Sequence, residues 1–336
     1  MPSFRTAAVT EVLLERSGLQ RVLTEAGRAY VLTQLTGPVA VGDRVILNTT
    51  AVELGLGTGG WHVVHWNLSH DTWSEPGPGH IIKLRYTSLQ TDTGAAEEAN
   101  PDLSSDLGGM PVVACSLHSQ VPCVAAALLA AVPTARIVYV MTDGAALPIA
   151  LSDLVVGMVT HALVAATITA GHAFGGDLEA VSIPSALVLA RSALGADVAI
   201  VAMGPGVVGT GSPLGTSSVE VANVLDAAAA LRGRPVAALR MSSADARERH
   251  RGVSHHSRTA LDLTRSTVTV ASPHEGAFSH ERHDVRVVEP PEMAPLLAAA
   301  GVAVTTMGRG PDEDPLFFAA AGAAGTLTAQ LLQPGG

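Results

Sequence analysis

The sequence predicts an α/β protein: a mostly parallel, doubly wound (Rossmann-like) sheet preceded by a small N-terminal antiparallel β-barrel. Period-two alternation interrupted by glycine turns runs through residues 6–67. After residue 80, near-continuous apolar runs alternate with alanine-rich stretches of helical length. Only 15% of the residues are charged and 47% are hydrophobic, which suits a sheet buried on both faces. We therefore expect a barrel domain over residues 1–75 and an α/β domain over residues 80–330.

The barrel is predicted from short apolar runs separated by turns such as Ser17-Gly18, Gly37-Pro38 and Gly42-Asp43. This spacing is typical of SH3-like and OB-like barrels. The glycine-rich residues 49–62 are expected to form either an ordinary barrel loop or an arm that reaches another domain or subunit. Residues 68–80 are polar and end in Pro-Gly-Pro-Gly, so we expect a linker there.

In the second domain, apolar runs predict strands and the alanine-rich stretches between them predict helices. Residues 154–171 have the length of a membrane span, but His161 lies near their middle, so a buried helix leading into a buried strand is the better interpretation. The predicted strands are 81–86, 112–117, 137–142, 163–170, 198–203, 236–241 and 268–271, and the clearest helices are 120–132, 185–194 and 217–232.

Charge and cysteine content exclude several functions. The formal net charge of −10 argues against non-specific nucleic-acid binding, which needs a basic surface. Cys115 and Cys123 are eight residues apart and fit neither a redox CxxC pair nor a zinc knuckle. No signal peptide is recognisable, so we expect a cytoplasmic protein that does not bind membranes. The low charge favours a homo-oligomer.

The strongest single motif is the glycine-rich loop after the strand at 198–203. Its glycines satisfy GxGxxG, and consecutive backbone N–H groups in such a loop can hold an anion. A dinucleotide site is disfavoured, because the next strand leads to Arg240 instead of an acidic residue. Alternatively, the glycines only permit a tight strand-to-helix crossing. The candidate ligand-binding residues of this loop are Gly204, Gly206, Gly209, Thr210, Gly211 and Ser212.

Polar residues follow several of the predicted parallel strands, where ligands of such sheets bind. His118, Asp143 and His172 are therefore candidate catalytic residues, for acid–base work or for binding a metal. Asp143 is equally well explained as a helix cap or Asx-turn. Ser119 is a possible nucleophile, although a helix N-cap explains it more simply.

Basic residues offer a further set of candidates. Lys83 is the only lysine in the chain, and we weigh a role that arginine cannot perform, such as a Schiff base, against chance retention. Lys83 and Arg85 are candidate ligand-binding residues, and either of them or Arg240 is expected to neutralise the charge of an anion.

The 13 histidines concentrate in two stretches, one with His250, His255 and His256 and one with His274, His280 and His283. Adjacent residues of a helix point about 100° apart, so His255 and His256 are not expected to share a metal readily. Ser254 is expected to cap the helix that carries them. Ordinary loop histidines are the favoured interpretation. His280 and His283 are expected in a solvated connection, and no particular metal or cofactor is predicted.

Several stretches together resemble an uncharacterised bacterial family, found in actinobacteria and Firmicutes, that is defined only as a domain of unknown function. The resemblance covers nearly the whole chain and implies a cytoplasmic bacterial protein, but no activity, cofactor or catalytic residue. The stretches that carry it are TAVELGLGTGGWH, GHIIKLRYTSLQ, LHSQ, TDGAALP, GPGVVGTGSPLGTSSVE and RHRGVSHHS.

The function expected from these residues is that of an enzyme that binds an anionic small molecule, such as a phosphorylated one, at the carboxyl ends of the parallel strands. The alternative is a non-catalytic ligand-sensing or assembly protein that uses the N-terminal β domain for interaction. Neither the substrate nor the reaction follows from the sequence.

Overall fold

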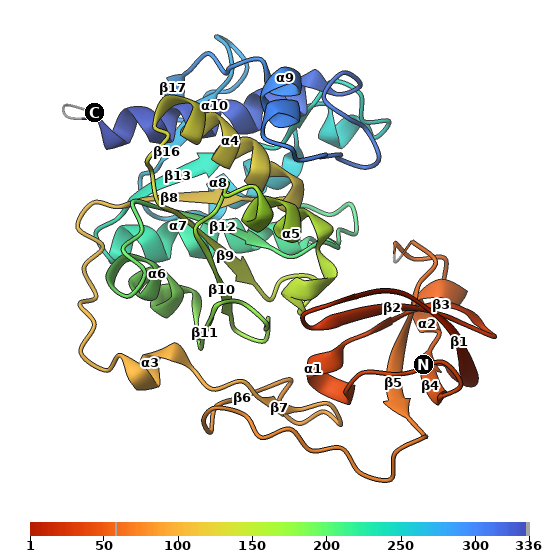
Figure 1. Cartoon of the computed structure of the whole chain (residues 1–336). Coiled ribbons are helices and arrows are strands. Elements are labelled where there is room, and N and C mark those ends of the chain that lie inside the picture. Colours follow the sequence, from red (N-terminus) through yellow and green to blue (C-terminus); the bar gives the residue numbers. More distant parts are fainter. Residues whose placement is uncertain (58, 334–336) are drawn as a thin grey trace. The chain divides into compact units, whose positions relative to one another are not determined.

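The computed structural model describes residues 1–57 and 59–333 (Figure 1). Residue 58, in the predicted glycine-rich loop, lies outside the described residues. The chain forms two compact units, Met1–Gly94 (the barrel unit) and Ala95–Gly336 (the sheet unit).

The barrel unit contains a closed barrel in the order β1-β2-β3-β5-β4, which confirms the predicted N-terminal barrel. All neighbouring strands are antiparallel except the β3–β5 pair, which is parallel. Alternate residues point inward, and small apolar side chains such as Val9, Val22 and Leu47 fill the interior. The strands are β1 (Phe4–Arg16), β2 (Leu19–Thr24), β3 (Gly27–Val31), β4 (Arg44–Asn48) and β5 (His62–Asn67), with short helices α1 (Thr33–Thr36) and α2 (Thr50–Glu53).

The predicted strand at 81–86 does not join the large sheet. Only β6 (Ile82–Lys83) is extended, and it pairs with β7 (Thr91–Asp92) in a separate antiparallel hairpin. Leu84 and Tyr86 have φ angles of 52° and 60°, in the left-handed region that ends a strand. The prediction that this segment supplies the first parallel strand is wrong for that reason.

The sheet unit is built on eight strands, all parallel, in the order β11-β10-β9-β12-β8-β13-β16-β17. Every residue of the central strands is buried, which explains their continuous apolar sequence. The doubly wound α/β prediction is therefore confirmed. The strands are β8 (Pro111–Cys115), β9 (Ile137–Thr142), β10 (Ala166–Ala170), β11 (Leu178–Ala180), β12 (Val198–Met203), β13 (Arg234–Ala238), β16 (Thr269–Ser272) and β17 (Asp284–Val287).

Helices cover both faces of this sheet (Figure 1). One apolar layer packs α4 (Val121–Ala131), α5 (Asp153–Thr160), α9 (Met293–Ala299) and α10 (Pro315–Leu332) against one face. The opposite layer contains α6 (Ile183–Ser192), α7 (Glu220–Ala230) and α8 (His255–Leu263). The short helix α3 (Ala96–Ala99) precedes β8.

Two apolar stretches have membrane-like character. Residues 154–171 form most of α5 and then β10, so the predicted helix followed by a buried strand is confirmed. The prediction that this helix is buried is wrong: in α5 only Val155 and Met158 are buried, whereas Val156 and Val159 are exposed. Among the described residues, α10 is the one helix long and apolar enough to cross a membrane by length and composition. It packs along α4, and 67% of its apolar window is buried within the fold.

The order of the strands reverses between β8 and β12. From β8 the chain crosses over to β9 on one side, and from β12 it crosses to β13 on the other. The two adjacent connections therefore diverge and leave a crevice at the carboxyl ends of their strands, which is where ligands bind in sheets of this kind.

Candidate functional site

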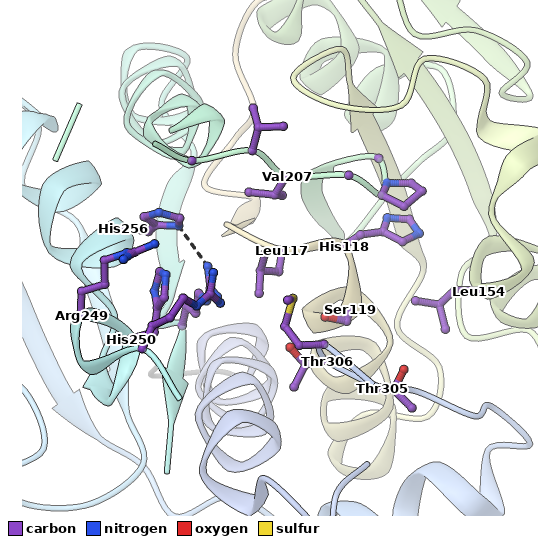
Figure 2. A pocket seen from close by; sticks show the side chains of 18 of the residues that line it. Leu117, His118, Ser119, Leu154, Val207, Arg249, His250, His256, Thr305 and Thr306 are labelled. Atoms are coloured by element: carbon purple, nitrogen blue, oxygen red, sulfur yellow. Dashed lines mark hydrogen bonds between the residues drawn. The ribbon is translucent and has the colours of Figure 1, made fainter. Parts of the chain in front are cut away.

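A pocket of about 460 Å³ lies at this reversal (Figure 2). We call it the switch pocket. Its wall comes from residues 117–119 after β8, residues 204–209 after β12, side chains of the 240–256 connection after β13, Leu154, and residues 303–307. All of these belong to the sheet unit. The location agrees with the expectation of a site at the carboxyl ends of the strands.

The first half of the glycine-rich loop lines the pocket, and a side chain at each of its glycines would be either crowded or strained by the backbone conformation. A Cβ on Gly204 would stand 2.5 Å from the carbonyl oxygen of Ala146, and Gly206 has a φ of 103°. A Cβ on Gly209 would stand 3.2 Å from Nε2 of His256. Thr210, Gly211 and Ser212 instead form an exposed turn, closed by the Thr210 N–H donating to the Gly215 carbonyl at 2.7 Å.

Arginines of the 240–256 connection make the pocket electropositive. Arg247 forms a bidentate pair with Asp245, with N···O distances of 3.0 and 2.9 Å, and this pair holds the pKa of Asp245 well below its usual range. Arg240 is only 6% exposed, and burial lowers its pKa to about 10, so it remains a cation at neutral pH. Arg249 is exposed on the pocket wall and makes no ion pair within the described part of the chain.

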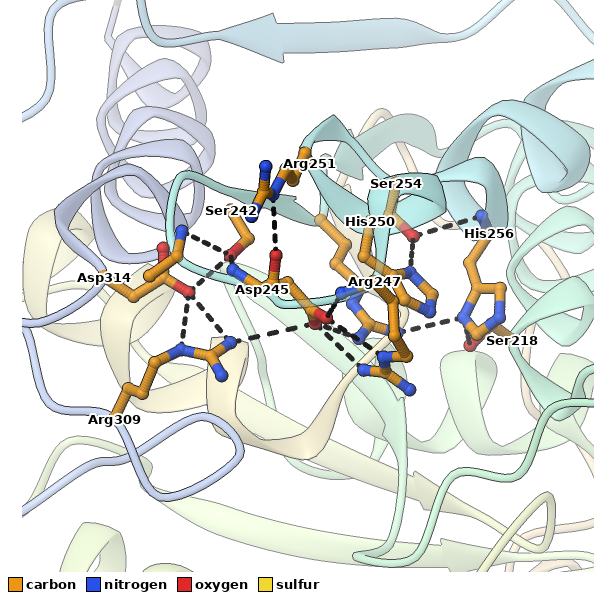
Figure 3. Close-up of polar contacts among 12 residues, drawn as sticks. Ser218, Ser242, Asp245, Arg247, His250, Arg251, Ser254, His256, Arg309 and Asp314 are labelled. Atoms are coloured by element: carbon orange, nitrogen blue, oxygen red, sulfur yellow. Dashed lines mark hydrogen bonds and ion pairs between the residues drawn. The ribbon is translucent and has the colours of Figure 1, made fainter. Parts of the chain in front are cut away.

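A second buried carboxylate supports this basic wall from behind (Figure 3). Asp314 accepts from Ser242 Oγ at 2.6 Å and from the Ser243 N–H at 3.0 Å, and it pairs with Arg309 at 3.1 Å. Arg309 also lies 3.8 Å from Asp245. The two carboxylates are thus occupied by Arg247 and Arg309, which leaves positive charge facing the pocket.

Three imidazoles meet beside these arginines. The ring centroids of His250, His255 and His256 are 4.4 to 5.0 Å apart. His250 and His256 line the pocket, and His255 packs against both. Burial together with the neighbouring arginines lowers the pKa of His250 to about 4 and that of His256 to about 3, and it also lowers the pKa of His255. All three rings are therefore neutral at pH 7.

The expectation that His255 and His256 diverge is wrong, as is the idea of scattered loop histidines for this stretch. Their rings tilt toward each other, and η4 (Glu248–His250) places the third ring beside them. Ser254 does cap α8 as predicted, accepting from the His256 N–H at 3.2 Å. In the second stretch, His280 stacks on His283 at 4.3 Å, and His283 is buried instead of solvated.

His118 forms part of the pocket wall, but both of its ring nitrogens are engaged. Nδ1 lies 3.0 Å from Tyr139 Oη, and Nε2 lies 2.7 Å from Ser152 Oγ. Tyr139 donates onward to the Ala202 carbonyl, so Nδ1 carries the proton and Nε2 accepts from Ser152. Burial lowers the pKa of His118 to about 4. This ring therefore links Tyr139, in the middle of β9, to Ser152 at the N-cap of α5, and Tyr139 continues the link to Ala202 in β12.

Asp143 and His172 lie together, and neither is among the residues that line the pocket. The Asp143 carboxylate is exposed and accepts the backbone N–H of His172 at 2.9 Å, which joins the connections after β9 and β10. The structure thus pairs these two candidates with each other, whereas His118 lines the pocket. Their acid–base roles stay predictions.

The remaining candidates fall into two groups. Lys83, which is buried on β6, and Arg85 belong to the barrel unit, whereas the switch pocket belongs to the sheet unit. Ser119 faces the pocket within η1 (His118–Gln120). It caps neither η1 nor α4, whose N-caps are Leu117 and Gln120, so the N-cap prediction for Ser119 is wrong.

Sequence reasoning missed Arg247, Arg249 and the role of Gln120. Gln120 is fully buried: its Oε1 accepts the N–H groups of Ser116 and Leu117, and its Nε2 donates to the Leu239 carbonyl at 3.0 Å. It thereby fastens the end of β8 to the segment after β13. Arg249 is the first residue of the RHRGVSHHS stretch, and Arg247 lies two residues before it, so the local signal for both is their position next to the histidines.

Residues 28–325 match the family described as "Protein of unknown function (DUF3866)". The chain belongs to the DUF3866 family. The match begins in β3, so it omits β1 and β2 of the barrel, and it covers nearly all of the sheet unit, including every residue of the switch pocket. Comparison with curated proteins and with solved structures gave no match. Membership of DUF3866 thus supports the predicted resemblance to a domain of unknown function and assigns no activity.

Proposed function

We propose that this protein is an enzyme that binds an anionic small molecule, such as a phosphorylated one, in the switch pocket. The observation that carries the proposal is the set of hydrogen-bond donors on residues that line the pocket: the Arg249 guanidinium, the buried Arg240 and the backbone N–H groups of Gly204, Gly206 and Gly209. Guanidinium groups and glycine-loop N–H groups are the donors that proteins use for phosphate and carboxylate oxygens.

The charge balance around the pocket favours an anion over a neutral ligand. Asp245 and Asp314 are already paired with Arg247 and Arg309, and both carboxylates are buried behind the wall. Arg249 therefore faces the pocket with its charge uncompensated by any described carboxylate. An oxyanion bound there gains charge-assisted hydrogen bonds in a site partly shielded from water.

An enzymatic role is supported by the three neutral imidazoles beside these donors. A neutral imidazole can accept a proton or bind a metal, which an imidazolium cannot. Two of the three rings, those of His250 and His256, line the same pocket as Arg249. The reaction is one that needs a base or a Lewis acid next to an anionic group.

Calorimetric titration of the metal-free full chain with inorganic phosphate tests the binding. We expect Arg249→Gln to weaken phosphate binding by about tenfold, because one charge-assisted hydrogen bond is lost. Arg286→Gln is the matched control, since Arg286 is exposed on β17 and, among the described residues, forms an ion pair only with Asp284. Equal phosphate affinities for the wild type and both variants would exclude the switch pocket as the anion site.

A ligand-sensing role is the second candidate, and the surface of the barrel favours it. Tyr30 and Trp61 stack at 4.8 Å, and Arg28 lies over the Trp61 ring, also at 4.8 Å. Such an aromatic and cationic patch suits contact with a partner. If phosphate raises the melting temperature and no phosphorylated compound in a panel is converted, the sensing role is favoured over the enzyme.

A further inference from the structure

We propose that His250, His255 and His256 bind a divalent transition-metal ion at the wall of the switch pocket. One ring nitrogen from each residue lies within 4.8 Å of the other two. Tetrahedral coordination with bonds of ~2.0 Å needs nitrogens ~3.3 Å apart, so small rotations of the rings close the site. This metal site goes beyond the proposed anion binding: the chain can bind an anion in the switch pocket even if these histidines bind no metal.

The backbone brings the three rings together by a short hairpin. β14 (Met241–Ser242) pairs with β15 (Gly252–Val253), which returns the chain so that His250 lies over the first turn of α8. His255 and His256 are the first two residues of that helix. The hairpin and the helix start are both hydrogen-bonded elements, so the cluster rests on ordered backbone.

The hydrogen bonds of His250 leave one nitrogen available to a metal. Its Nδ1 lies 2.7 Å from Ser254 Oγ, the same oxygen that caps α8. A ligating histidine commonly donates its second ring N–H to such a partner, which fixes its orientation. Nε2 of His250 is then the nitrogen that can bind the metal.

His255 supplies an independent observation. Its Nε2 is buried and has no hydrogen-bond partner in the described part of the chain. An unsatisfied buried nitrogen is costly, and native proteins rarely leave one without a purpose. A metal ion between the rings satisfies this nitrogen directly.

His256 is restrained by Arg240, whose guanidinium donates to Nδ1 at 3.0 Å. A guanidinium only donates, so Arg240 must leave Nδ1 whichever nitrogen binds the metal. If Nε2 binds, Ser218 Oγ, 3.3 Å from Nδ1, is the next acceptor for the displaced proton. Arg240 then has Asp245, now 3.8 Å away, as its nearest carboxylate.

The chemistry of the ligands selects the metal and its co-ligand. Three imidazoles without a carboxylate favour Zn²⁺, Co²⁺, Ni²⁺ or Fe²⁺ over Mg²⁺ and Ca²⁺. Three protein ligands leave a coordination position open, as catalytic sites do. Because Arg240 and Arg249 repel a bare dication, we expect an anion from the pocket to occupy that position.

Titration of the chelator-treated full chain with Co²⁺, followed by its visible d–d absorption and then by displacement with Zn²⁺, tests the site. We expect one Co²⁺ per chain in the wild type. His250→Gln and His255→Gln should each weaken Co²⁺ binding by at least about tenfold. His280→Gln is the matched control, because His280 also stacks on a second histidine, His283, but lies outside the pocket.

The proposal is overturned if the wild type takes up no Co²⁺, or if all three variants bind it as the wild type does. If circular dichroism shows that a variant does not fold, the melting temperature of the wild type still tests the proposal. We expect Zn²⁺ to raise that melting temperature and Mg²⁺ to leave it unchanged. Phosphate titration of the metal-free protein separates the two proposals, since it tests the anion site without the metal.

Discussion

The guanidinium of Arg240 donates to Nδ1 of His256, and this contact determines which nitrogen of that ring carries the proton. Because Nδ1 accepts, the neutral imidazole is protonated at Nε2, which faces Gly209 across the pocket wall. In the metal-free protein His256 is therefore a donor toward the pocket, which suits an anion. The same contact holds the ring in the tautomer that a metal has to displace.

Arg240→Met separates these two consequences. The substitution removes a cation and frees Nδ1, so we expect Co²⁺ to bind about tenfold more tightly and inorganic phosphate to bind more weakly. Absorption titration measures the first effect and calorimetry the second. Changes of the same sign for both ligands would show that Arg240 does not link them in this way.

Gly204 is expected to tolerate no side chain. In Gly204→Ala the new Cβ would lie 2.5 Å from the Ala146 carbonyl oxygen, so the loop has to shift. We expect phosphate to bind more weakly and the free energy of unfolding to fall by about 1–3 kcal/mol. Gly310→Ala is the control, since its Cβ would meet nothing closer than Glu313 at 3.8 Å. Both are measured by urea denaturation and calorimetry.

His118 makes stability depend on pH. Its pKa is about 4 in the folded protein and near 6.5 when unfolded, so the unfolded chain binds more protons between these values. The contribution of His118 is complete above pH 6.5 and falls as the pH drops to 4, by up to about 3 kcal/mol. Urea denaturation across this range measures it.

The comparison that isolates this residue is His118→Gln. The variant is expected to be less stable at pH 7, because Tyr139 and Ser152 lose their shared partner, and to show a shallower fall between pH 6.5 and 4. Parallel curves for variant and wild type would mean that the other buried histidines account for the whole pH dependence.

Gln120 is expected to resist even an isosteric change. In Gln120→Glu the group that donates to the Leu239 carbonyl becomes an oxygen, and a carboxylate is buried without a cation, so we expect a loss of about 2 kcal/mol or more. Gln330→Glu on the exposed side of α10 should change stability little. Thermal unfolding of the two variants side by side gives the comparison.

The fold was largely predictable because buried parallel strands leave a strong local signal. β9 and β12 are continuous apolar runs, and the structure has them within the predicted ranges. β11 and β17 were missed because edge strands of three and four residues with mixed burial carry no such run. The segment around Leu84 was predicted as a strand because apolar residues recur along it. The left-handed φ of Leu84, which ends the strand, cannot be predicted from a leucine in the sequence.

The site was predictable only where its signal is local. The glycine loop and the placement of a pocket at strand ends follow from residues close in sequence. The meeting of His250 with His256 depends on the β14–β15 hairpin, and the charge left over on Arg249 depends on which arginines Asp245 and Asp314 have already taken. Which arginine pairs with which carboxylate depends on residues far apart in the sequence, so no local sequence pattern predicts it.

The connection from Arg240 to His256 has a consequence for how this fold can change. These seventeen residues carry the pocket's arginines and all three clustered histidines, and they run from just after β13 into the first turn of α8. The rest of the wall is mainly backbone, apolar groups and small hydroxyls. Most of the charged and titratable side chains of the pocket thus come from residues 240–256, whereas the sheet is formed by other parts of the chain. Replacing this one segment would therefore change the reactivity of the pocket and leave the sheet the same.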